Sequence, residues 1–202
     1  MIGISVIILG MAGVAGSQDL SGHSPASERV VDSSLGISFD SVGRIEKRDG
    51  SYLVTFVSTA GTPIKSTFAE MSVSDRPFVD LPGSYGGRLY FDRPDAKRWL
   101  SNMVLTDSIV SGQLKFRREY WTVYSGMGAW EGVINCYAKV KDRYYVLSLT
   151  RDKRLGKPGE VVNGRPLSAA GLKEALLAGM RDTSDVEVQA FNKLLTSVKI
   201  QY

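Results

Sequence analysis

The stretch YWTVYSGMGAWEGVINCYAKVKDRYYVLSL, residues 120–149, decides the fold of this chain. It contains three runs rich in aromatic and β-branched side chains, a composition typical of strands: 120–124, 130–140 and 144–149. The short turn Lys141-Asp142-Arg143 separates the last two runs, so these two strands should run antiparallel. Residues 120–149 therefore predict an antiparallel β-meander.

One face of the 130–140 strand is predicted to be the core face. Ile134, Cys136, Ala138 and Val140 lie at alternate positions, and alternate side chains of a strand share one face. The other alternating set is more polar. Cys136 is the only cysteine, so an intramolecular disulfide is excluded, and we expect its thiol to be buried and inert.

Further strand and helix patterns flank the meander on both sides. Strand-like runs are predicted at 36–40, 51–57, 67–73 and 88–91, and helices at 94–104 and from about Ser168 and Ser184 onward. Ser184 and Glu187 have the spacing of a helix capping box. Together these elements predict an α+β fold, in which an antiparallel sheet is covered by helices as in an α/β/α sandwich.

The chain divides by composition into three parts. Residues 1–17 are predicted to be a signal peptide, and residues 18–34 a polar linker without regular structure. Residues 35–202 are long enough for a single α+β domain with its own core.

The first residues predict export to the periplasm or the extracellular space. The apolar run of residues 2–9 is too short to cross the roughly 30 Å core of a bilayer as a helix. Small residues follow it, with Ala15 and Ser17 in the positions that a signal peptidase requires. We expect the mature chain to have no transmembrane segment.

Cleavage after Ser17 is therefore the expected result for the native protein. N-terminal sequencing of protein purified from its own source should return a chain that begins at Gln18. A sequence that began at Met1 or Ile2 would contradict export by this signal.

The inventory of reactive side chains disfavours most enzyme classes. His23 is the only histidine, and it lies in the predicted linker. A histidine base, a Ser-His triad and a histidine-rich metal site are therefore not expected. We assign no catalytic residue, no metal ligand and no cofactor.

Carboxylate pairs leave one enzymatic alternative open. Glu and Asp can perform acid–base chemistry without histidine, at separations of about 5 to 10 Å. Glu131, between two apolar neighbours, and Glu119 are the candidates. The alternative function is thus a small carboxylate-dependent hydrolase that acts on a glycan or another cell-envelope substrate. A strand-end position facing water, or a pair with Arg117 or Arg118, is the structural interpretation of Glu131.

Basic residues crowd around the last two strands of the meander. The chain has 25 Lys and Arg against 21 Asp and Glu, a formal net charge of +4, which favours anionic partners. If the hairpin brings its two ends together, seven residues form one candidate binding site: Lys139, Lys141, Arg143, Arg151, Lys153, Arg154 and Lys157. Its partner would be an anionic protein, glycan or membrane surface, and a merely solvated edge is the alternative. Nucleic acid is disfavoured because the protein is expected to be exported.

Three stretches resemble the PsbP/Mog1-like group. They are LGISFD at residues 35–40, YYVLSLTRDKR at 144–154 and FNKLLTSVKI at 191–200, while Ser41-Val42-Gly43-Arg44 replaces the Pro-x-Gly-Trp turn typical of that group. The resemblance implies an antiparallel sheet covered by helices and an accessory or binding role. Our prediction is thus an exported, non-enzymatic binding or accessory module, with its ligand and oligomeric state left open.

Overall fold

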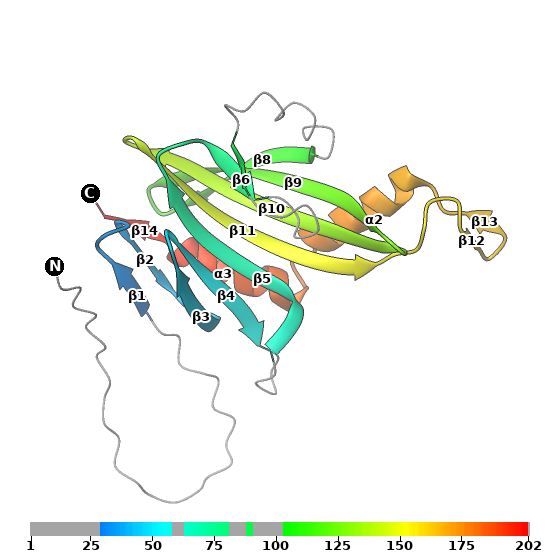
Figure 1. Ribbon diagram of the computed structural model, residues 1–202, viewed down its shortest axis with the longest axis horizontal. Helices are drawn as coiled ribbons and strands as arrows, with labels where there is room; N and C mark the ends of the chain where they lie inside the picture. The colour runs from blue at the N-terminus through cyan, green and yellow to red at the C-terminus, as the bar shows by residue number, and fades with distance from the viewer. Residues whose placement is uncertain (1–28, 58–62, 81–87, 91–102, 202) are drawn as a thin grey trace, which may run out of the picture.

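A computed structural model describes residues 29–57, 63–80, 88–90 and 103–201. Its main element is a seven-stranded antiparallel sheet in the order β3-β4-β5-β11-β10-β9-β8. The strands are β3 (Gly43–Arg48), β4 (Ser51–Val57), β5 (Pro63–Ser74), β8 (Met103–Ser111), β9 (Leu114–Gly126), β10 (Ala129–Val140) and β11 (Arg143–Arg154). The predicted meander is confirmed as β9, β10 and β11, which lie side by side near one end of this sheet (Figure 1).

Three small sheets accompany the main one. β1 (Arg29–Asp32), β2 (Ile37–Asp40) and β14 (Lys199–Ile200) pair in the order β1-β2-β14. β6 (Phe78–Asp80) pairs with β7 (Arg88–Tyr90), and β12 (Val161–Val162) with β13 (Arg165–Pro166). The β12–β13 hairpin projects beyond the end of the main sheet (Figure 1).

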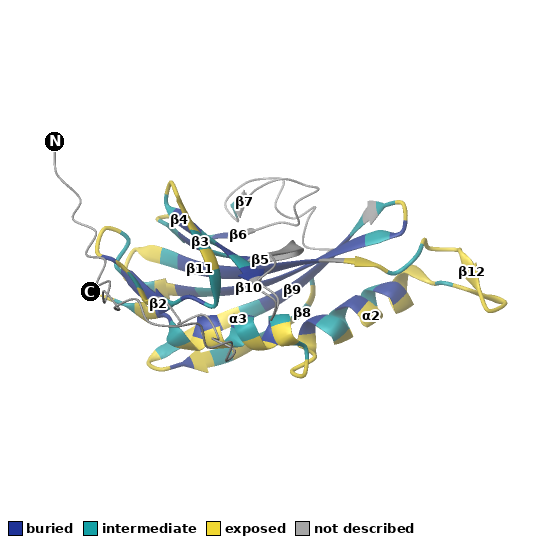
Figure 2. Ribbon diagram, turned by 90° about the horizontal axis from the view of Figure 1, so that it is seen from below, coloured by how far each residue is buried: buried dark blue, intermediate teal, exposed yellow. Residues whose placement is uncertain are grey.

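Two helices cover one face of the main sheet. α2 (Ala169–Arg181) and α3 (Val186–Ser197) lie on the same side of it (Figure 2). The apolar side chains that they bury are Leu172, Leu176, Met180, Val188, Phe191, Leu194 and Leu195. The predicted α+β fold, an antiparallel sheet packed against helices, is confirmed, and both helices that the structure describes cover the same face.

A glycine lets α2 approach the sheet closely. A Cβ atom at Gly132 of β10 would lie 2.6 Å from the Sδ atom of Met180. Real Cβ atoms do not approach so closely, so any larger residue at position 132 would displace Met180.

The start of the folded part differs from the prediction. Residues 29–34 were expected to belong to the linker, but Arg29–Asp32 form β1, which pairs with β2. The reason is non-local: β2 supplies the hydrogen-bonding partner that this polar strand needs. Residues 1–17 of the predicted signal and residues 18–28 lie outside the described residues.

Two helix boundaries are also corrected. The helix predicted at 94–104 lies largely outside the described residues, and its last two residues, Met103 and Val104, begin strand β8. α3 is capped by Asp185, not by Ser184, because the Asp185 carboxylate accepts hydrogen bonds from the amides of Glu187 and Val188 at 2.9 and 3.2 Å.

Both faces of the central strand β10 are buried. Cys136 on the helix side is fully buried, as predicted, but Val133 and Asn135 on the opposite side are also 0% exposed. Phe78 of β6 is buried near that opposite side, where β6 contacts β10 and β11. The more polar of the two alternating sets is therefore also an interior face. Among the described residues, no helix is long and apolar enough to cross a membrane.

Candidate functional site

The seven basic residues of the predicted site do not lie together. Lys139, Lys141 and Arg143 surround the β10–β11 turn, whereas Lys153 and Arg154 are the last residues of β11 and Lys157 follows it. Arg143 and Arg151 alone are eight residues apart on one strand, roughly 26 Å at 3.3 Å per residue. The hairpin holds its two ends apart, so the expectation of one continuous patch is wrong.

Two residues at the turn end make contacts within the protein. Arg143 donates hydrogen bonds from Nη1 to the carbonyl oxygens of Ser34 and Leu35, at 3.2 and 3.4 Å. The Lys139 ammonium lies 5.4 Å from the centroid of the Tyr144 ring. These side chains therefore help to hold the β1–β2 turn and the end of the sheet in place.

Arg151 is buried and cannot belong to a binding surface. Its Nη2 atom donates to Asp185 Oδ2 at 2.7 Å and pairs with Glu187 Oε2 at 3.0 Å, and Nη1 donates to the Gly179 carbonyl at 3.0 Å. Burial alone would raise the pKa of Asp185, but the hydrogen bonds from Arg151 and from the helix amides lower it. The side chain is 1% exposed, so it joins β11 to both helices and offers nothing to a partner.

The far end of the hairpin has a different character. Lys153, Arg154, Lys157 and Arg165 are all exposed there, together with three exposed apolar side chains: Val161 (66%), Val162 (44%) and Met127 (87%). We call these seven residues the basic tip. Between Lys153 and Arg165 the only acidic residue is Glu160, whose Oε2 atom accepts a hydrogen bond from the Lys157 amide at 2.8 Å.

Backbone geometry makes the basic tip one structural unit. Asn163 and Gly164 have φ values of 50° and 75°, the pair of positive values that a two-residue type I′ hairpin turn requires. The amides of Leu155 and Gly156 both donate to the Gly128 carbonyl, at 3.0 and 3.1 Å. These bonds tie the segment just after β11, which leads into the β12–β13 hairpin, to the β9–β10 turn that carries Met127.

The two predicted glutamates lie apart and are buried. In the β9–β10 ladder Glu131 is opposite Val123 and Glu119 is opposite Asn135, an offset of roughly 13 Å along the strands. Glu131 is 8% exposed, so it does not face water as one interpretation expected. Its register partner on the neighbouring strand β11 is Asp152.

Glu119 is held by three donors. Its carboxylate accepts hydrogen bonds from Trp121 Nε1 at 3.2 Å and the Tyr137 hydroxyl at 3.3 Å, and pairs with Arg117 Nε at 3.0 Å. Burial, followed by the nearby Glu119, raises the pKa of Tyr137 to about 12, which keeps its hydroxyl protonated as a donor. The sequence suggested Arg117 or Arg118 as a partner of Glu131, but Arg117 forms its ion pair with Glu119.

A row of polar side chains crosses the sheet on the face opposite the helices. Glu70, Ser148, Asn135 and Glu119 are successive register partners on β5, β11, β10 and β9. The last three are at most 2% exposed, and buried polar groups need hydrogen-bond partners, which all four have. Sequence reasoning missed this row, because register across four strands cannot be read from one strand at a time.

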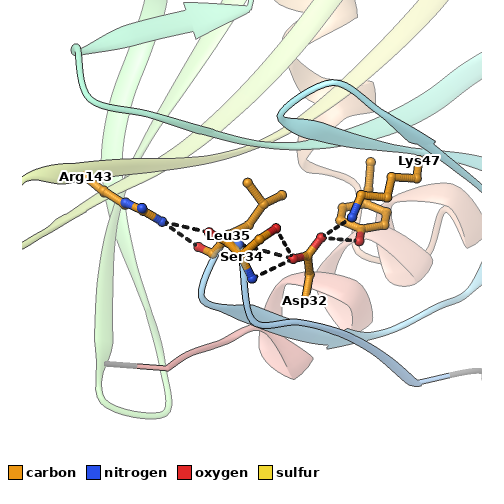
Figure 3. Close-up of polar contacts among 6 residues, drawn as sticks. Asp32, Ser34, Leu35, Lys47 and Arg143 are labelled. Atoms are coloured by element: carbon orange, nitrogen blue, oxygen red, sulfur yellow. Dashed lines mark hydrogen bonds and ion pairs between the residues drawn. The ribbon is translucent and has the colours of Figure 1, made fainter. Parts of the chain in front are cut away.

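Asp32 is the most densely bonded carboxylate outside that row (Figure 3). It accepts hydrogen bonds from Lys47 Nζ and the Tyr52 hydroxyl, both at 2.6 Å, and from the Ser34 hydroxyl and the amides of Ser34 and Leu35. Burial alone would raise the pKa of Asp32, but these hydrogen bonds outweigh it and lower the pKa well below its usual range. A carboxylate saturated in this way anchors the β1–β2 turn and has no lone pair left for a substrate proton.

Cys136 is buried as the sequence predicted. It is 0% exposed, and burial raises the pKa of its thiol to about 12. The reactive thiolate is therefore not populated at neutral pH. Within the described ranges no group of three or more His, Cys, Asp or Glu side chains is placed to hold a metal ion.

Comparisons with known proteins add little to this description. No family model and no curated protein matches the chain. A crystal structure of a protein from Bacteroides thetaiotaomicron aligns over 87% of this chain with a TM-score of 0.44 and 10% identity. The alignment covers 49% of that protein, so this chain spans about half of its length. A likeness at this level assigns neither a family nor a function.

Proposed function

We propose that this protein is a non-enzymatic binding module of the cell envelope that docks on an anionic membrane surface through its basic tip. The observation that supports the proposal is the mixture of side chains on the projecting hairpin. Exposed valines beside lysine and arginine suit the boundary between anionic headgroups and acyl chains, where apolar groups enter and cations pair with phosphate. A glycan or a charged protein surface would offer less apolar area for the exposed side chains of Val161 and Val162 to contact.

The expected strength follows from the charges. Each Lys or Arg near an anionic bilayer contributes about 1 kcal/mol. The four basic residues of the tip thus contribute about 4 kcal/mol, which is about a thousandfold in affinity. Each valine adds an apolar contribution that depends on how deeply it enters, at about 0.8 kcal/mol for every CH₂ group that leaves water. Such binding is reversible and weakens with salt, because exposed charges are screened beyond roughly 10 Å at 0.1 M.

The test compares charge reversal at the tip with charge reversal elsewhere. The tip variant combines Lys153→Glu, Arg154→Glu and Arg165→Glu. The control variant combines Lys115→Glu, Lys193→Glu and Lys199→Glu. These three lysines are exposed and far from the tip, and their replacement changes the net charge by the same amount. Binding to phosphatidylcholine vesicles that contain phosphatidylglycerol is measured by co-sedimentation. We expect the tip variant to lose at least about tenfold in affinity and the control less than about twofold.

Folding should hardly change in either variant, because exposed charges contribute little to stability. Equal losses in the two variants would show that only net charge matters, and would overturn the proposal. Equal binding of the unmodified protein to pure phosphatidylcholine vesicles would overturn it as well.

A further inference from the structure

A cavity of about 210 Å³ lies on the helix side of the sheet, the face opposite the polar row. Its walls come from β9, β10, the C-terminal end of α2, and α3. Four apolar side chains line it, Ile134, Met180, Val188 and Phe191, and the uncharged polar residues Thr183 and Asn192 line it as well. Drug-sized pockets are about 300–1,000 Å³, but a dry cavity of about 150 Å³ holds benzene in another protein, so the space suits a small organic molecule.

A tyrosine of β9 also lines this cavity. Tyr120 lines the cavity and is 2% exposed. Its hydroxyl makes no hydrogen bond within the described part of the chain, and it is not one of the buried side-chain atoms left without a partner there, which are Thr122 Oγ1 and Arg151 Nε. The hydroxyl is therefore accessible from the cavity, where water or a ligand can accept its hydrogen bond. Burial, only partly offset by the charge of Arg118, raises the pKa of Tyr120 and keeps the hydroxyl protonated.

Two arginines supply positive charge at the same cavity. Arg118 forms a two-pronged pair with Asp107, through Nε at 2.7 Å and Nη2 at 2.8 Å. Nη1 stays available, because a guanidinium group has five N–H donors. Arg181, in the last turn of α2, is exposed and has no ion-pair partner among the residues that the structure describes. Two guanidinium groups and one carboxylate leave a net charge of +1 at the cavity.

The combination defines the ligand class. A single positive charge, one phenolic donor and an apolar wall complement a small monoanion with an apolar body. We propose that the cavity binds a small carboxylic acid, with its carboxylate against Arg118, Arg181 and the Tyr120 hydroxyl and its apolar body against Met180 and Phe191. This site is separate from the basic tip, and neither proposal depends on the other.

Benzoate is the probe, and benzyl alcohol is its uncharged counterpart of similar size. Binding is followed by NMR through the methyl signals of Ile134 and Met180, which line the cavity. We expect benzoate to shift these signals in a saturable manner, and benzyl alcohol to bind at least about tenfold more weakly.

Two variants test the polar contacts. Arg181→Met removes an exposed charge and Tyr120→Phe removes only a hydroxyl, so each should leave the fold intact and weaken benzoate binding about tenfold. Arg44→Met, at an exposed arginine on the edge strand β3 that does not line the cavity, is the control and should bind as the unmodified protein does. Absence of saturable shifts at Ile134 and Met180, or equal affinity in all three variants, would overturn the proposal.

Discussion

Replacement of Arg151 by Ala is expected to lower the free energy of unfolding by about 3–5 kcal/mol, the range for breaking a buried ion pair. The change leaves Asp185 and Glu187 without the cation that neutralises them, and it leaves the Gly179 carbonyl without its donor. Because the same guanidinium group contacts α2 and α3, both helices should loosen from β11. Urea denaturation followed by circular dichroism at neutral pH measures the effect.

Arg154→Ala is the matched control. This residue lies on the same strand, three positions further on, but it is exposed. Its loss should change the free energy of unfolding by less than about 0.5 kcal/mol, as for most surface substitutions. If the two variants were equally stable, Arg151 would not be the structural anchor that its contacts indicate.

Arg151 was predicted to belong to a surface site, but it is buried. The error shows the limit of a prediction that considers one strand at a time. Its position has the same parity as Leu147 and Leu149, which face the core, so the alternation itself indicated an inward side chain. Its charge indicated a surface position, because unpaired charges are seldom buried. Only the acidic start of α3, which is distant in sequence, resolves the conflict, and no local pattern brings it there.

Strands with a clear alternation of apolar and polar residues could be predicted from the sequence. Strands that depend on contacts with a distant part of the chain could not. β4 was predicted at its observed bounds, since residues 51–57 alternate clearly after an Asp-Gly turn. β1 has only Val30 and Val31 as apolar residues, and it exists through its ladder with β2 and the bonds to Asp32. β8 exposes Val104 and Val110 to 36% and 66%, so its apolar side chains do not mark one buried face.

The candidate sites depended still more on distant contacts. The basic residues of the tip were predicted to belong to a binding site, apart from Arg165, but no strand was predicted at Val161 and Val162. The cavity joins Tyr120 to Arg181, sixty-one positions apart, through the packing of two helices on a sheet. Such a juxtaposition has no signature in the sequence of either element.

Asp32→Asn is expected to destabilise the protein by about 2–3 kcal/mol at neutral pH. Hydrogen bonds to a charged group contribute about 1.5–3 kcal/mol, and the Asn amide cannot accept all of the bonds that the carboxylate accepts. The amide group would also place a donor against the Lys47 ammonium or the Tyr52 hydroxyl. Both effects weaken the link between β1, β3 and β4.

The pH dependence has a definite sign. The pKa of Asp32 is lower in the folded protein than in the unfolded chain, where it has the usual value of about 3.9. The unfolded chain therefore takes up a proton first as the pH falls, and the stabilisation is lost below about pH 4. It is fully present above that value. The difference in unfolding free energy between the unmodified protein and Asp32→Asn should thus be constant from about pH 8 to pH 5 and shrink below about pH 4.

Urea denaturation at a series of pH values measures this difference, with Asp40→Asn as the control. Asp40 pairs with Arg29 at 2.6 Å, but the two side chains are 38% and 42% exposed, so the control should lose at most about 1 kcal/mol. A gap for Asp32→Asn that stayed unchanged down to pH 3 would show that the variant acts through packing and not through the lost charge. A gap no larger than that of Asp40→Asn at pH 7 would show that the network around Asp32 contributes no more than an ordinary surface pair.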